Sequence, residues 1–128
     1  VGLMNGIMGI YNAWIDRVPI YMMGASGPQD ATQRTPWIHW IHGNRDQAAM
    51  IRHFIKWDDT PGSAAAAIES IRRATILART QPCGPVFINL DATIQEQELI
   101  AACGAAERRF ADVSVQADFA FARQFNLG

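Results

Sequence analysis

The chain has 128 residues and a formal net charge of −1, with 49% hydrophobic and 18% charged residues. This length and balance are typical of one folded domain rather than a disordered chain. The charge gives no electrostatic footprint for nucleic acid, and no apolar run reaches the roughly 18 residues of a membrane span. Two cysteines are too few for a disulfide framework. We therefore expect a cytoplasmic protein that binds neither nucleic acid nor membrane.

The first predicted element is an apolar helix from Leu3 to Ile15. Three glycines lie near one side of it: Gly2, Gly6 and Gly9. Because glycine in a helix costs about 1 kcal/mol, we expect close backbone packing against a sheet to offset that cost. The chain opens at Val1 without methionine and enters this helix directly, so we expect it to be cut from a larger protein.

Three short apolar runs predict buried strands: Val18–Gly24, Phe54–Trp57 and Pro85–Asp91. The first is followed by a loop of small and turn-forming residues, from Gly24 to Pro36. Two short helices are expected before the second strand, over Trp37–His42 and Asp46–Arg52.

A longer helix is predicted between the second and third strands. Thr60 before Pro61 suits a helix N-cap, and Ser63 is the alternative. The helix should end before Pro82. We expect its inward stripe to be Ala64, Ile68, Ile71, Thr75 and Ala78.

Strands that alternate with helices predict an α/β fold with a partial parallel sheet of about three strands and flanking helices. We assign residues 1–99 to this partial domain, and its missing strands would lie upstream of Val1. Residues 100–128 are expected to be a C-terminal extension or linker, with one helical segment at Ala106–Phe110. An open α/β sheet binds ligands beyond the carboxyl ends of its strands. Here those ends are Gly24–Ser26, Trp57–Asp59 and Leu90–Asp91.

Three segments in this order resemble the N-terminal, pyrimidine-binding domain of thiamine-diphosphate-dependent enzymes. They are GLMNGIMGIYNAWIDRVPIYMMG, RHFIKWDDTPGSAAAAIESIRRA and QPCGPVFINLD. Acetolactate synthase, benzoylformate decarboxylase and related 2-oxo acid decarboxylases are the most similar in appearance. The resemblance covers roughly residues 1–99 and implies a fragment of a thiamine-diphosphate-binding fold.

The resemblance implies that the strand ends hold the aminopyrimidine ring of thiamine diphosphate at a subunit interface. The diphosphate and Mg²⁺ would then be held by a second domain of the parent enzyme, in a partner subunit. The family's activating glutamate lies upstream of the segment matched at Val1, and the Gly-Asp-Gly metal motif is absent. We therefore expect no catalytic residue in this chain, no cofactor bound by it alone, and self-association as a dimer or larger oligomer.

The resemblance also suggests individual site residues. Asn5 matches a small polar residue near the aminopyrimidine, although a helix N-cap role explains it equally well. Gly24, Ala25 and Ser26 would contact the cofactor, with Ala25 standing where many relatives have glutamine. Gln33 is the expected polar contributor from the following loop to the substrate pocket.

The stretch TPWIHWIHGNRDQ, from Thr35 to Gln47, leaves three readings open. His39 and His42 could bind zinc from one helix face, but no further ligand is evident nearby. Ordinary packing or subunit contact suits the tryptophans, which combine a large apolar area with a polar group. In the third reading Trp37 and His39 line the substrate pocket, because the family's corresponding segment approaches the active site.

Two functions of different classes follow. The first is part of a thiamine-diphosphate enzyme that acts on 2-oxo acids, as a decarboxylase or an acetolactate synthase-like carboligase. The alternative is a noncatalytic α/β protein-interaction module whose exposed aromatic residues mark a partner surface. Cys83, at a predicted helix end, lacks the cationic setting that activates a thiol and carries neither function.

Overall fold

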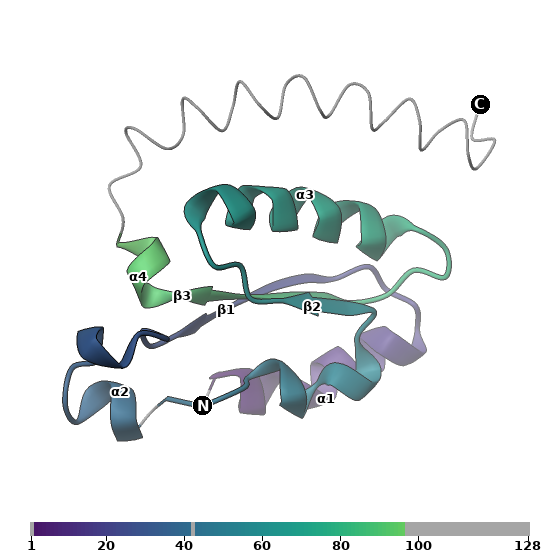
Figure 1. Ribbon diagram of the computed structural model, residues 1–128. Coiled ribbons are helices and arrows are strands. Elements are labelled where there is room, and N and C mark those ends of the chain that lie inside the picture. Colours follow the sequence, from purple (N-terminus) through teal and green to yellow (C-terminus); the bar gives the residue numbers. More distant parts are fainter. Residues whose placement is uncertain (1, 42, 97–128) are drawn as a thin grey trace. The chain divides into compact units, whose positions relative to one another are not determined.

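A three-stranded parallel sheet forms the centre of the structure, a computed structural model that describes residues 2–41 and 43–96 (Figure 1). The strands are β1 (Tyr21–Ser26), β2 (Trp57–Asp59) and β3 (Val86–Asp91), in the spatial order β1-β3-β2. β3 pairs in parallel with both neighbours. The predicted fold class is confirmed. The expected extension at residues 100–128 and the helix within it lie outside the described residues.

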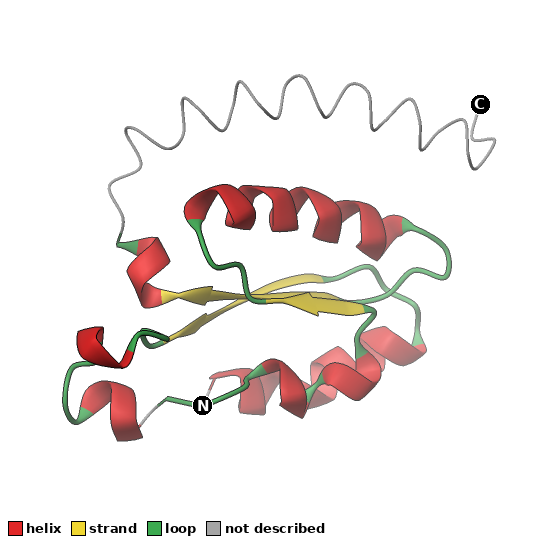
Figure 2. Cartoon of the chain, viewed as in Figure 1, coloured by secondary structure: helices red, strands yellow, loops and turns green. Residues whose placement is uncertain are grey.

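Helices cover both faces of the sheet (Figure 2). α1 (Gly2–Ile15) and two 3-10 turns, Ala48–Met50 and Arg52–Phe54, lie on one face. α3 (Ala64–Arg79) lies on the other. The remaining short elements are a 3-10 turn at Ala31–Gln33, α2 (Ile38–Ile41) and α4 (Ala92–Gln95), which follows β3 directly.

The central strand β3 explains why the two helical layers sit where they do. Its side chains alternate between the faces of the sheet, as in any strand. Val86 and Ile88 pack against Ala74 and Ala78 of α3. Phe87 faces the opposite way, where the core members are Ile10, Ala48, Ile51 and Ile55. Five of the six residues of β3 are buried, as expected for a strand covered on both faces.

The second strand begins three residues later than the sequence predicts. Phe54 ends a 3-10 turn, and Lys56 donates from Nζ to the carbonyl oxygens of Leu77 and Thr80, at 2.5 and 2.6 Å. The lysine thereby caps the carboxyl end of α3, while its own N–H donates to the Pro85 carbonyl oxygen at 2.8 Å, directly before β2 begins at Trp57. The short helix predicted for Asp46–Arg52 is present as the 3-10 turn Ala48–Met50, and a second 3-10 turn begins at Arg52.

The N-cap of α3 is Ser63, the alternative of the two predicted caps. Ser63 Oγ accepts a hydrogen bond from the Ala66 N–H at 3.2 Å, so the Thr60 assignment was wrong. The predicted inward stripe is right only at its two ends. The residues that α3 buries are Ala64, Ala67, Ser70, Ala74 and Ala78. Such small side chains allow the helix to lie close to the sheet, and they leave the bulkier Ile71 exposed.

The three glycines of α1 do not pack closely against the sheet, contrary to expectation. A Cβ added at Gly2, Gly6 or Gly9 would meet no atom within 4 Å. The contacts with the core come instead from larger side chains of the same helix, including Leu3, Ile7 and Ile10. α1 also presents an exposed apolar stripe, which consists of Met4, Met8, Tyr11 and Ile15.

Candidate functional site

The carboxyl ends of β1 and β3 lie side by side and share one buried carboxylate. Ser26 is the register partner of Asp91, and the Asp91 carboxylate accepts hydrogen bonds from the N–H groups of Gln29 and Thr93, both at 2.7 Å. It also accepts from the Thr93 hydroxyl. Burial raises the pKa of Asp91, but the hydrogen bonds from Thr93 and Gln29 outweigh this and hold that pKa below its usual value. Asp91 therefore ties the loop after β1 to the start of α4.

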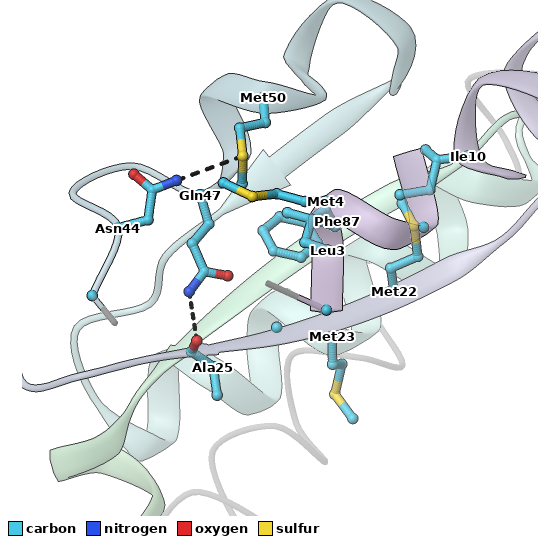
Figure 3. Close-up of a pocket in the computed structure, with 14 residues that line it drawn as sticks. Leu3, Met4, Ile10, Met22, Met23, Ala25, Asn44, Gln47, Met50 and Phe87 are labelled. Atoms are coloured by element: carbon cyan, nitrogen blue, oxygen red, sulfur yellow. Dashed lines mark hydrogen bonds between the residues drawn. The ribbon is translucent and has the colours of Figure 1, made fainter. Parts of the chain in front are cut away.

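A cavity of about 850 Å³ opens between α1, the end of β1 and the segment that follows α2. We call it the α1 pocket and define it by Leu3, Gly6, Gly24, Gln47, Met50 and Phe87. Figure 3 shows the Phe87 ring next to Leu3 and below Met4 and Met50, while Met23 points away from them on the other side of β1. The volume is that of a typical small-molecule site.

Gly24 is required by the wall of the α1 pocket. A Cβ at this position would lie 2.6 Å from Phe87 Cζ, well inside van der Waals contact, and at a tight 3.2 Å from Gln47 Oε1. Because Phe87 is buried in the core, its ring has little room to withdraw. The glycine therefore lets the backbone of β1 form the wall directly beside an aromatic ring.

Few polar groups reach the α1 pocket. The Gln47 amide donates from Nε2 to the Ala25 carbonyl oxygen at 2.6 Å, and Asn44 donates to the Met50 sulfur at 3.7 Å (Figure 3). Gln47 Oε1 has no donor among the described residues, so it is available to accept a hydrogen bond from a ligand. Within residues 2–41 and 43–96, no titratable side chain lines the pocket. Such a site suits a flat, mostly apolar ring that carries one or two hydrogen-bonding groups.

A second, more polar cavity lies beside the first, with a volume of about 1080 Å³. We call it the Asn89 crevice and define it by Ser26, Arg34, His39, Arg45, Arg52 and Asn89. It shares Gly43, Asn44 and Gln47 with the α1 pocket. The two cavities therefore meet along the segment that follows α2.

Ion pairs fix one wall of the Asn89 crevice. Arg52 pairs with Asp46 at 3.1 Å and with Asp58 at 2.9 Å. These hydrogen bonds raise the pKa of Arg52, and the same bonding lowers the pKa of Asp46. The acidic pair Asp58-Asp59 by itself suggests a solvated turn before the helix, but the structure places it elsewhere. Both lie in β2, and Asp59 accepts a hydrogen bond from the Ser70 hydroxyl of α3.

The structure brings four of the seven residues proposed from the sequence to these cavities. Gly24 and Ala25 line the α1 pocket, and Ser26 and His39 line the Asn89 crevice. The His39 ring accepts a hydrogen bond at Nδ1 from the Thr35 N–H at 2.9 Å, which fixes its orientation.

The other three proposed residues line neither cavity. Asn5 is exposed within α1 rather than at its N-cap, and Gln33 is exposed at the end of a short 3-10 turn. Trp37 is 79% exposed with a φ of 77°, a left-handed conformation that is uncommon for a bulky residue. The zinc reading needs His42, which lies outside the described residues; within 2–41 and 43–96 no group of three or more potential ligands gathers.

Several residues of the two cavities were not anticipated. The sequence predicts Phe87 and Asn89 only as members of a buried strand. Gln47 is the last residue of the stretch TPWIHWIHGNRDQ, in which only the histidines and tryptophans suggest a function. Asn89 could have been identified from the sequence, because an asparagine inside the apolar run VFINLD is unusual for a buried strand. Gln47 could not have been identified in this way, since its contact with Ala25 spans 22 residues of sequence.

No family model matches the chain. Among the described helices, none is both long enough and apolar enough to cross a membrane.

Proposed function

We propose that the α1 pocket holds the aminopyrimidine half of thiamine diphosphate in an enzyme that acts on 2-oxo acids. The observation that carries this proposal is the position of the pocket, against the carboxyl-terminal half of β1 in a parallel sheet, with the Phe87 ring and the Gln47 amide oxygen in its wall. The sequence resemblance supports the same assignment. The reaction would be a decarboxylation or an acetolactate synthase-like carboligation.

The residues of the α1 pocket fit the ring and not the rest of the cofactor. Phe87, Met50 and Leu3 offer apolar contacts to a heteroaromatic ring, and Gln47 Oε1 can accept from its amino group. When bound, the cofactor supplies the carbon nucleophile, while the protein orients it and excludes water. No carboxylate is among the described residues that line the pocket, so the proposal assigns control of the proton on the ring to a group outside this lining.

The proposal assigns the diphosphate and Mg²⁺ to another domain of the parent enzyme. The proposed setting is a cytoplasmic oligomer in which the chain contributes the ring pocket and a subunit contact. The exposed stripe of α1, which includes Met8 and Ile15, supports a contact of this kind.

A leucine at Gly6 should block the pocket without disturbing the fold. Gly6 lines the α1 pocket, yet a Cβ there meets no atom within 4 Å, and leucine is a better helix former than glycine. Titration of the isotopically labelled chain with the free aminopyrimidine half of the cofactor should shift the amide signals of Gly24 and Ala25, with weak, millimolar affinity. Gly6→Leu should remove these shifts.

Gly9→Leu is the matched control. Gly9 has the same open surroundings in the same helix, but it does not line the pocket, so this variant should bind like the unmodified chain. Magnesium pyrophosphate should leave the amides of the α1 pocket unchanged. If the pyrimidine produces no localised shifts, or if Gly6→Leu and Gly9→Leu behave alike, the cofactor assignment fails.

That failure would favour the alternative, a noncatalytic interaction module. The observation that favours this alternative is the exposed apolar surface, in particular Trp37 and the α1 stripe.

A further inference from the structure

The side chain of Asn89 has an unused acceptor in a nearly closed environment. Asn89 is 7% exposed, and its Nδ2 donates to Ser26 Oγ at 3.1 Å. Its Oδ1 is shielded from water and has no hydrogen-bond partner among residues 2–41 and 43–96. Buried acceptors are almost always paired, because desolvating one without a partner is unfavourable. A donor from a bound molecule would complete this amide.

Ser26 provides the complementary half of the same site. Its oxygen accepts from Asn89, and no described residue accepts the proton of its hydroxyl. Ser26 and Asn89 both line the Asn89 crevice, so an unused acceptor and an unused donor lie next to each other on the neighbouring strands β1 and β3. A ligand reaches Oδ1 when the side chains that cover this atom move aside, because the atom is closed to water in the unliganded chain. A hydroxyl group is both donor and acceptor, and it matches this pair.

The charge of the Asn89 crevice favours an anion. Arg52 is neutralised by Asp46 and Asp58, and Arg34 donates to the carbonyl oxygens of Pro28 and Gln29. The third arginine of the crevice, Arg45, is not engaged in this way. Arg45 is exposed, and in the described part of the chain no ion pair or hydrogen bond occupies it. A charged guanidinium of this kind binds carboxylate or phosphate groups through charge-assisted hydrogen bonds.

We propose that the Asn89 crevice binds a small organic anion that carries a hydroxyl group. Arg45 pairs with the anionic group, and Asn89 and Ser26 hold the hydroxyl. Carboxylates and phosphates share this chemistry, and the volume of about 1080 Å³ admits either kind of molecule. This site is distinct from the α1 pocket and does not depend on the cofactor proposal.

Four probes separate the two parts of the recognition. Glycerol 3-phosphate and glycerate each carry an anionic group and hydroxyls, methyl phosphate carries the anion alone, and glycerol carries hydroxyls alone. In amide-shift titrations of the 128-residue chain, at least one hydroxylated anion should bind about tenfold tighter than methyl phosphate or glycerol, the size expected for one added hydrogen-bonded group. The tighter of the two identifies the head group. Equal affinity for methyl phosphate and both hydroxylated anions would overturn the proposal.

Variants assign the two ends of the ligand. Arg45→Gln should weaken binding of the hydroxylated anion about tenfold or more, as expected for a lost charge-assisted bond, whereas Arg79→Gln on α3 should not. Asn89→Leu should remove the advantage of the hydroxylated anion over methyl phosphate, and Ser26→Ala tests the same point where the leucine variant fails to fold. If Arg45→Gln and Arg79→Gln weaken binding equally, the anion is attracted by the overall charge of the chain and not by a specific site, which contradicts the proposal. Gly6→Leu, which blocks the α1 pocket, should not change binding of the hydroxylated anion. The test of the Asn89 crevice is therefore independent of the test of the α1 pocket.

Discussion

Replacing Phe87 with alanine should lower the free energy of unfolding by about 3–5 kcal/mol, the range measured for large aromatic truncations in cores. Phe87 is fully buried and joins α1 to the 3-10 turns through Ile10, Ala48, Ile51 and Ile55. Urea unfolding followed by circular dichroism measures the change. Ile76→Ala, at an exposed position of α3, is the control and should cost about 0.5 kcal/mol or less.

Phe87 should also be coupled to Gly24. Gly24→Ala should cost about 1–3 kcal/mol, because the new methyl group overlaps the ring atoms Cζ and Cε2 of Phe87. Leucine at position 87 has no such atoms, so the same glycine substitution should cost clearly less in a Phe87→Leu background. An equal cost in both backgrounds would show that the ring does not lie against Gly24.

Asp91→Asn should be the second strongly destabilising change, by about 2–4 kcal/mol at neutral pH, because charge-assisted hydrogen bonds to a buried carboxylate are lost. The amide replaces one acceptor oxygen with a donor, which cannot satisfy both the Gln29 and the Thr93 N–H groups. Asp16→Asn is the matched control. Asp16 is exposed, and the substitution should leave stability nearly unchanged.

The effect at Asp91 should depend on pH in one direction. The pKa of Asp91 is lower in the folded chain than its ordinary value, so its contribution to stability is present above the unfolded-state pKa, about 3.9. That contribution is lost as the pH falls through the folded-state pKa. The difference in unfolding free energy between the unmodified chain and Asp91→Asn should therefore shrink in acid. A difference that stays constant from pH 7 to about pH 2.5 would contradict the assigned hydrogen bonds.

The sheet was predictable because its signals are local. Apolar runs that end in Gly24 and Asp91 lie within a few residues of the observed strands, and intervening helical periodicity is typical of parallel pairing. The second strand was misplaced because its partners are distant in sequence. The Lys56 ammonium group donates to carbonyl oxygens at the end of α3, 21 and 24 residues away. Asp59 accepts a hydrogen bond from Ser70. Neither contact can be read from the pattern of residues around them.

Apart from His39, which the motif around it suggested, the site was predictable where backbone position decides it. Gly24, Ala25 and Ser26 follow from the rule that ligands bind at strand ends, and the structure places them in cavity walls. Side chains that complete the cavities depend on packing between elements far apart in sequence. Gln47 reaches back to Ala25, and Asn89 meets Ser26 across 63 residues. The close packing predicted for the glycines of α1 was wrong for a similar reason. The elements that a helix face contacts depend on the tertiary structure and not on the local sequence.

The most direct test of the account is a set of backbone nuclear Overhauser contacts in the labelled 128-residue chain. If three parallel strands end at one shared edge, amide and α-proton contacts should connect Gly24 with Asn89 and Ser26 with Asp91 on one side of β3. On its other side, they should connect Asp59 with Ile88. Contacts that pair Tyr21 with Asp91 in the opposite direction, or none between these segments, would contradict the shared edge on which both proposed sites depend.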